Sequence, residues 1–176
     1  MLCAINVSLG LVTSGVLTWA PTSLVRQFNF STTSAGLITS LYSAVGILSG
    51  LTAGFFADRI FKRRNPLLLL AILSQTAVIA ISVLENAYMN VLLLLLSGFF
   101  GPMGWIVGPA MMSDWFSLRA AGTVTGLLGA TGSMGGALGP LIFGAVLDAT
   151  GSFGFGWLTL GLIALVRARC RKKEGR

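Results

Sequence analysis

The chain has 176 residues, of which 55% are hydrophobic and 10% are charged, and its formal net charge is +7. Soluble domains carry about 25% charged residues, so this composition excludes an ordinary soluble domain and favours a chain embedded in a lipid bilayer. The chain contains no histidine, which excludes Ser-His-Asp triads and histidine-ligated zinc sites, so we expect neither an enzyme nor a metal or cofactor.

Six charge-poor stretches predict six membrane-spanning helices. A helix needs about 20 apolar residues to cross the hydrocarbon core, and backbone amides in lipid must pair within the helix. The predicted spans cover residues 2–25, 34–57, 66–84, 88–113, 119–147 and 153–167. We therefore expect an all-α polytopic membrane protein in which residues 1–168 form one bundle and residues 169–176 form a basic tail.

The distribution of basic residues predicts the orientation of these spans. All but one of the 12 Lys and Arg residues follow the second, fourth or sixth span, and Arg26 is the exception. Because basic loops stay in the cytoplasm, both termini are predicted to be cytoplasmic, in the plasma membrane or bacterial inner membrane. The positive charge then serves as an orientation signal beside anionic headgroups, and we expect no nucleic acid partner. Arg26 either extends to the membrane interface or attracts an anionic solute.

The first two spans carry an aromatic anchor and a glycine row. Trp19 in the first span has the position of an anchor at the membrane interface. In the second span Gly46, Gly50 and Gly54 recur at four-residue intervals, and Asp58 continues the row at the cytoplasmic end. Glycines at such spacing allow membrane helices to approach one another closely.

The fifth predicted span contains the longest glycine series in the chain. Its glycines recur every three or four residues and are predicted to share one side of the helix: Gly122, Gly126, Gly129, Gly132, Gly135 and Gly139. Pro140 follows directly and is expected to bend the helix, because proline lacks a backbone donor. Two interpretations stay open, namely static close packing or an interface along which packed helices slide.

Two motifs resemble the major facilitator superfamily of transporters. Residues 54–64 (GFFADRIFKRR) are similar to the family's G-x-x-x-D-[RK]-x-G-[RK]-[RK] loop between the second and third helices, although Phe61 replaces its second glycine. Residues 126–144 resemble the G-x8-G-x3-G-P-x2-G-G motif in the fifth helix of a half, with Phe143 in place of one glycine. The matching positions are Gly126, Gly135, Gly139, Pro140 and Gly144. The resemblance covers nearly the whole chain.

The resemblance leaves two possibilities for the half of a transporter that the chain represents. Residues 91–112 contain no arginine, which first halves usually have there, and residues 148–152 resemble an outer loop of second halves. Residues 121–123 and 19–21 are similar to second halves of organophosphate antiporters and anion:cation symporters. These features favour the C-terminal half, whereas the fifth-helix motif is better known from first halves.

Members of this family move a small solute by alternating access between two six-helix bundles. The resemblance therefore implies secondary active transport, with an organic anion as one candidate solute. It also implies pairing with a second six-helix half, from the same or another chain. The alternative is a truncated or non-transporting membrane protein that binds other membrane subunits through its glycine-rich helix faces.

The resemblance also implies which residues form the site. Asp58 either holds the cytoplasmic side shut by meeting a helix N-terminus of the other half, or is a solvated acid paired with Arg59 or Lys62. The gating loop comprises Gly54, Asp58, Arg59, Lys62, Arg63 and Arg64. The helix-packing residues are Gly46, Gly50, Gly126, Gly135, Gly139, Pro140 and Gly144. In this family the first, second, fourth and fifth helices of a half face the transport pathway. The substrate-lining residues that the resemblance implies are therefore Thr13, Ser14, Thr18, Tyr42, Ser43, Trp105 and Thr131.

Overall fold

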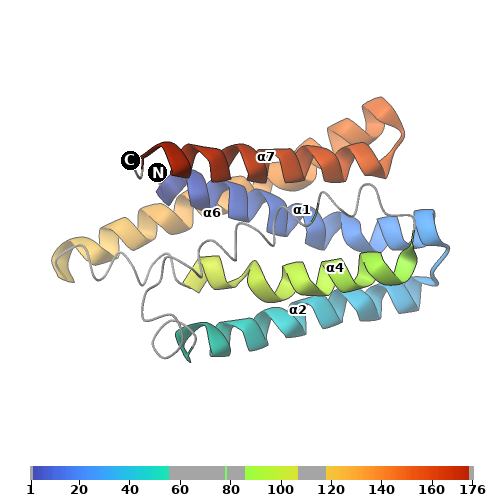
Figure 1. Cartoon of the computed structure of the whole chain (residues 1–176), viewed down its shortest axis with the longest axis horizontal. Helices are drawn as coiled ribbons and strands as arrows, with labels where there is room; N and C mark the ends of the chain where they lie inside the picture. Colours follow the sequence, from blue (N-terminus) through green and yellow to red (C-terminus); the bar gives the residue numbers. More distant parts are fainter. Residues whose placement is uncertain (1, 56–77, 79–85, 107–117, 175–176) are drawn as a thin grey trace.

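The computed structural model describes residues 2–55, 78, 86–106 and 118–174, and all the regular structure within them is helical. The helices are α1 (Leu2–Phe28), α2 (Thr32–Phe55), α4 (Ala87–Phe100), α6 (Leu118–Thr150) and α7 (Phe153–Glu174). They lie side by side with their axes roughly aligned, and the start of α1 and the end of α7 lie at the same end of the bundle (Figure 1). The predicted all-α fold is confirmed. The predicted span over 66–84 lies outside the described residues, apart from Val78.

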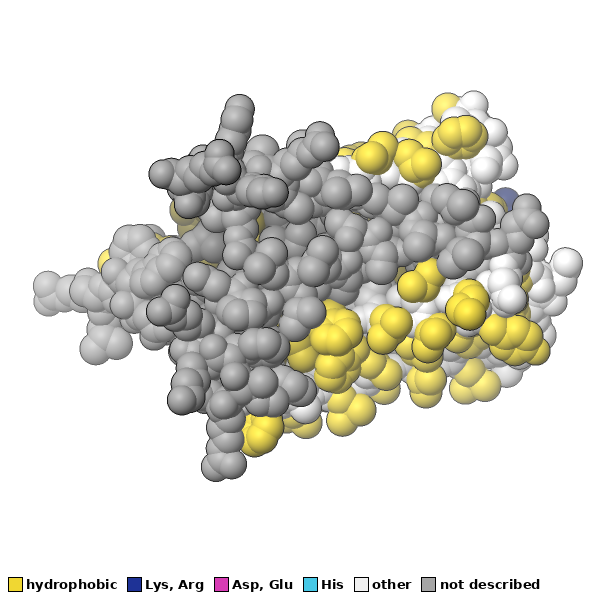
Figure 2. All heavy atoms as spheres, in the orientation of Figure 1, with side chains coloured by type: hydrophobic (Ala, Val, Ile, Leu, Met, Phe, Trp, Pro, Cys, Tyr) yellow, Lys and Arg dark blue, Asp and Glu magenta, His cyan; other side chains and the backbone are white. Residues whose placement is uncertain are grey.

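Length and composition allow four helical segments to cross a membrane. These segments are Cys3–Phe28, Thr32–Phe55, Ala87–Ile106 and Gly122–Thr150, and Phe153–Ile163 is a shorter apolar helix. Large apolar side chains remain exposed on their outer surfaces, such as Leu51 at 76% and Ile47 at 69% on α2. Figure 2 shows such side chains over the part of the molecule where α2 and α4 lie. An apolar exterior of this kind suits a protein surrounded by lipid.

The loop between α1 and α2 is short and is closed by local hydrogen bonds. Asn29 has a positive φ of 55°, and the Phe30 amide donates to the Leu24 carbonyl at 3.3 Å. Ser31 caps α2, because its side-chain oxygen accepts from the amide of Ser34 at 3.2 Å. The helix therefore begins at Thr32, two residues before the predicted start of the second span.

The turn between α6 and α7 uses a glycine where the backbone requires one. Gly151 has φ 68°, a conformation that glycine adopts without the penalty of a side chain, and its amide donates to the Leu147 carbonyl at 2.7 Å. From Phe153, α7 continues to Glu174. The basic segment predicted as a tail from 169 thus continues the last helix, since Ala, Arg and Lys favour helix and no Gly or Pro interrupts residues 162–174.

The fourth span consists of α4 and a short continuation beyond a proline. Asn86 caps α4 by accepting from the Tyr88 amide at 3.0 Å. After Gly101 and Pro102 the chain is helical again over 103–106, where the Trp105 amide donates to the Pro102 carbonyl at 3.0 Å. The proline interrupts the regular ladder of hydrogen bonds but leaves the direction of the span largely unchanged (Figure 1).

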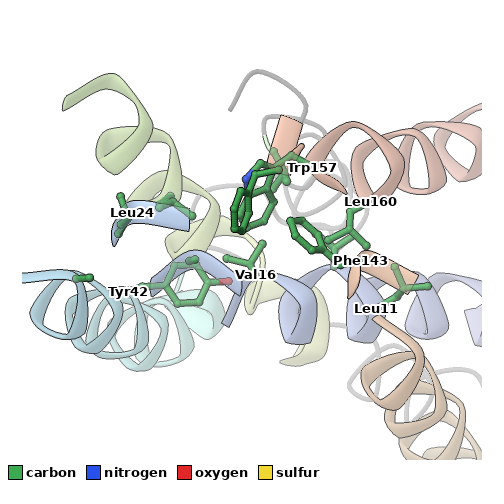
Figure 3. Close-up of a cluster of buried hydrophobic side chains, with 13 residues drawn as sticks. Leu11, Val16, Leu24, Tyr42, Phe143, Trp157 and Leu160 are labelled. Atoms are coloured by element: carbon green, nitrogen blue, oxygen red, sulfur yellow. The ribbon is translucent and has the colours of Figure 1, made fainter. Parts of the chain in front are cut away.

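Helix α1 lies at the centre of the described bundle. It packs along α6 over most of its length and also contacts α2 and α7, while α2 packs against α4. The main cluster of buried side chains joins α1, α2, α6 and α7 (Figure 3). Trp157 of α7 and Phe143 of α6 are its largest fully buried side chains.

Neighbouring helices meet where a large side chain lies against a glycine. At each such glycine, a β-carbon would crowd the ring or branch of the facing residue. The pairs, with the large residue first, are Tyr42 on Gly98, Trp105 on Gly132, Phe143 on Gly156, Leu160 on Gly15 and Trp19 on Gly144. Because lipid supplies no hydrophobic force between helices, this interdigitation provides the contacts that hold them together.

Candidate functional site

The closest helix contact in the described residues joins the backbones of α1 and α6. A β-carbon at Gly135 would overlap the carbonyl oxygen of Val7, and one at Gly139 would overlap that of Leu11. From the other side, a β-carbon at Gly10 would overlap the carbonyl oxygen of Gly132. Only glycine fits at these positions, so α1 and α6 form one closely joined pair.

The glycine series of α6 does not lie on one side of the helix as predicted. Gly132, Gly135 and Gly139 face α1, whereas nothing lies within 4 Å of a β-carbon built at Gly126 or Gly129. Gly122 is equally open. A step of three residues turns about 60° less than one full helical turn. The three successive three-residue steps from Gly126 to Gly135 therefore move the glycines from one side of the helix to another. Half of the series thus packs inside this bundle and half faces outward.

Two glycines of α2, Gly46 and Gly50, face the fourth span. A β-carbon at Gly46 would lie 3.4 Å from Cγ of Pro102, and one at Gly50 would lie 3.2 Å from Cδ1 of Ile106. Gly54 at the end of α2 is exposed, with nothing within 4 Å of the β-carbon position. The other gating-loop residues, Asp58, Arg59, Lys62, Arg63 and Arg64, lie outside the described residues.

Pro140 is held by a residue of α1. The indole nitrogen of Trp19 donates to the Pro140 carbonyl at 3.1 Å, and its ring stacks on Phe143 with centroids 5.3 Å apart. Gly144 leaves room for this ring, since a β-carbon there would lie 3.2 Å from Trp19 Cζ2. Trp19 is therefore a helix-packing residue, and the prediction of an interface anchor is wrong. Its donor satisfies a carbonyl of the neighbouring helix instead of a headgroup.

Phe143 connects three helices at the position where the family motif has glycine. It contacts Trp157 edge to face, with centroids 4.8 Å apart, and lies 6.3 Å from the Phe153 ring. A β-carbon at Gly156 of α7 would lie 2.6 Å from Cζ of Phe143. The glycine that α6 lacks is thus offset by a glycine on α7.

The predicted substrate-lining hydroxyls differ in what they bond. Ser43 donates to the Thr39 carbonyl at 3.2 Å and Thr131 to the Leu128 carbonyl at 2.9 Å, so their protons are used within their own helices. The hydroxyl of Thr13 is buried and has no hydrogen-bond partner among the described residues. Ser14 faces α6, where its oxygen would lie 2.9 Å from a β-carbon at Gly136, and Thr18 is exposed.

The two predicted aromatic lining residues differ in exposure. Tyr42 is only 6% exposed; its ring covers Gly98. The hollow it borders, between α1, α2 and α4, is lined by Val16, Leu17, Ala20, Ile38, Thr39 and Leu94. Trp105 is only partly buried and reaches from the end of the fourth span to Gly132 on α6. The structure therefore brings Trp105, and not Tyr42, to an accessible position beside α6.

Sequence reasoning missed three features of this region. The Ser49 hydroxyl is buried without a partner among the described residues, as is the indole nitrogen of Trp157. The seat that Gly132 forms for Trp105 also went unrecognised. A single sequence gives no signal for these three features, because each depends on how a helix is rotated against its neighbour.

Comparison with known proteins agrees with the resemblance. The family model of the Major Facilitator Superfamily matches residues 2–168. The chain is 28% identical over 159 residues to the probable galactarate/D-glucarate transporter GudP of Bacillus subtilis, which covers 85% of the chain and 34% of that relative. It is 32% identical over 151 residues to putative glycerol-3-phosphate transporter 5 of Arabidopsis thaliana, covering 77% of the chain and 30% of the relative.

A third relative is similar over a longer stretch of the chain. Sugar phosphate exchanger 3 of Bos taurus is 28% identical over 172 residues, which covers 92% of the chain and 34% of the relative. The chain thus spans about a third of the length of these relatives. The family model thus matches nearly the whole chain, and the motif glycines Gly135 and Gly139 pack against α1. This membrane protein therefore belongs to the Major Facilitator Superfamily.

Proposed function

We propose that this chain is one six-helix half of a secondary transporter that moves a small organic anion across a membrane by alternating access. The observation that carries the proposal is the family match over residues 2–168 of a chain that spans only a third of its relatives. A transport pathway needs two walls, so the function requires a second half from the same or another chain. We infer that this chain is the C-terminal half, with both termini in the cytoplasm.

The outward part of α6 supports a second half as partner. Gly122, Gly126, Gly129 and Ser133, here called the small-residue face, share one side of α6 and are exposed. Leu127, Met134, Leu138 and Leu141 form the large-residue face beside it, with Met134 64% and Leu141 68% exposed. Small residues permit close helix packing, whereas large flexible ones suit lipid chains. We infer that the small-residue face receives the second half.

Helix α2 repeats this division. Gly36, Ser40 and Ser43 are exposed on one side, and nothing lies within 4 Å of a β-carbon at Gly36. Leu37 and Leu41 are 67% and 54% exposed on the adjacent side. Both α2 and α6 thus present a small-residue side and a large-residue side. We infer that the two small-residue sides together form a larger contact surface for a second bundle than α6 alone.

The substrate class is inferred from the relatives. Galactarate, D-glucarate, glycerol 3-phosphate and sugar phosphates are all small hydroxylated anions, and they appear in the names of the relatives. In the membrane-span candidates of the described residues, charged residues stand only near helix ends, at Arg26 and Asp148. We therefore assign charge recognition and ion coupling to the rest of the transporter, and neutral contacts to Thr13, Ser14, Thr18 and Trp105. For Asp58 we propose the gating role, which closes the cytoplasmic side.

Uptake by reconstituted protein tests the proposal. The chain is placed in proteoliposomes alone, so that copies can pair, and together with the two thirds of the Bacillus subtilis relative that it does not cover. We expect uptake of radiolabelled D-glucarate or glycerol 3-phosphate above that of protein-free liposomes in at least one preparation. If neither preparation accumulates any member of an organic-anion panel, the chain is a non-transporting membrane protein instead.

A further inference from the structure

Trp105 lies where α1, α6 and the fourth span meet. A β-carbon at Gly132 would lie 2.5 Å from Cζ3 at the tip of the Trp105 ring, so the ring rests on bare backbone of α6. The carbonyl of the same glycine faces Gly10 of α1. Any side chain at 132 would displace the ring, and the seat is therefore specific to glycine.

Two hydroxyl groups of α1, those of Thr13 and Ser14, lie within one turn of Gly10 along the helix. Nine serines and threonines of the described helices donate to a carbonyl of their own preceding turn. These residues are Ser8, Ser23, Thr39, Ser43, Thr52, Ser97, Thr131, Thr150 and Thr159. Thr13, one turn beyond Gly10, has no partner among the described residues. Ser14 faces Gly136, one turn beyond Gly132.

We propose that Trp105, held in position by Gly132, is the specificity-determining platform for the hydroxylated carbon chain of the substrate. An indole offers a flat face for C–H groups and an N–H donor for a hydroxyl, and Trp105 keeps part of its surface exposed. Within the membrane-span candidates of the described chain, Arg26 and Asp148 are the charged residues and both stand near helix ends, so the platform suits the neutral part of an anion. Gly132 acts as a positioning residue. The inference rests on the proposed function and names the part of the substrate that this half contacts.

Fluorine NMR of the purified chain tests the platform independently of transport. The four tryptophans are labelled with 5-fluorotryptophan, and Trp105→Phe identifies the Trp105 signal. D-Glucarate is titrated against adipate, a dicarboxylate of the same chain length without hydroxyl groups. We expect a saturable shift of the Trp105 signal with D-glucarate and a much smaller shift with adipate.

Gly132→Ala and Gly129→Ala form a matched pair of variants. Gly132→Ala should move the Trp105 signal in the absence of ligand and abolish the D-glucarate shift. In the monomeric chain in detergent, Gly129→Ala should leave both unchanged, because nothing lies near its β-carbon position and no second half is bound to the small-residue face. The remaining tryptophan signals report whether each variant is folded. If Gly132→Ala does not fold, the comparison of D-glucarate with adipate on the unmodified chain still decides the question.

The inference is overturned if the Trp105 signal ignores D-glucarate, responds equally to adipate, or responds identically in the two glycine variants. Its failure is distinct from failure of the proposed function. Uptake without a selective Trp105 response would support the proposed transport function and contradict the role of Trp105 as a platform. A selective Trp105 response without uptake by any preparation would support the platform and contradict the proposed transport function.

Discussion

Replacing Gly135 by alanine is expected to destabilise the chain, whereas the same replacement at Gly126 is expected to stabilise it slightly. At Gly135 the new methyl group would overlap the Val7 carbonyl, so α1 and α6 must separate. Overpacking of this kind costs about 1–3 kcal/mol, or more where backbone must move. At Gly126 the β-carbon position is open, and alanine gains about 0.5–1 kcal/mol over glycine within a helix.

Thermal unfolding of the two variants in detergent measures this difference. The apparent Tm should fall for Gly135→Ala and stay level or rise for Gly126→Ala, relative to the unmodified chain. Both substitutions lie on α6 and add the same group, so helix propensity cancels in the comparison. Equal Tm values for the two variants would show that α1 and α6 do not meet through their backbones at this point.

Phe143→Ala is expected to have the second large effect. The side chain is fully buried and touches the rings of Trp19, Trp157 and Phe153. Removal of a buried phenylalanine costs about 3–5 kcal/mol, because the cavity adds to the lost contacts. The loss should loosen α7 in particular, since Phe143 fills the space opposite Gly156.

Phe155→Ala is the matched control for Phe143→Ala. Phe155 lies on α7 and is 57% exposed, so its removal should change stability by no more than about 0.5 kcal/mol. Tryptophan fluorescence and thermal unfolding of the two variants provide the comparison. A loss of stability as large for Phe155→Ala as for Phe143→Ala would contradict the packing of the aromatic cluster.

Much of the fold is predictable because the bilayer restricts the possible structures. A chain with few charges and long apolar stretches must form helices, and Gly135 and Gly139 mark a close approach whatever the partner is. The identity of that partner is not encoded locally. Nothing in the sequence indicates that Gly135 faces Val7 or that Gly129 lies on the open side of α6, because a rotation of the helix would exchange the two faces.

The site is less predictable than the fold for the same reason. The sequence favours an interface anchor at Trp19, because tryptophans near span ends usually have that role, yet its indole nitrogen donates to the Pro140 carbonyl. Tyr42 was expected to line the pathway but covers Gly98. Serine and threonine offer the same hydroxyl everywhere, and only the three-dimensional neighbours distinguish Thr13 from Thr131. The gating loop around Asp58 stays a prediction from the resemblance alone.

Spin labelling of α6 tests most directly whether this chain is one half of a larger transporter. Cys3 and Cys170 are first replaced by serine, and nitroxides are then attached at positions 129 and 133 on the small-residue face and at 134 and 138 on the large-residue face. In the reconstituted preparation that takes up D-glucarate, the large-residue positions should collide frequently with oxygen dissolved in lipid. The small-residue positions should be restricted and shielded from oxygen. Equally high collision rates on both faces would place all of them in lipid and contradict the assignment of a second half.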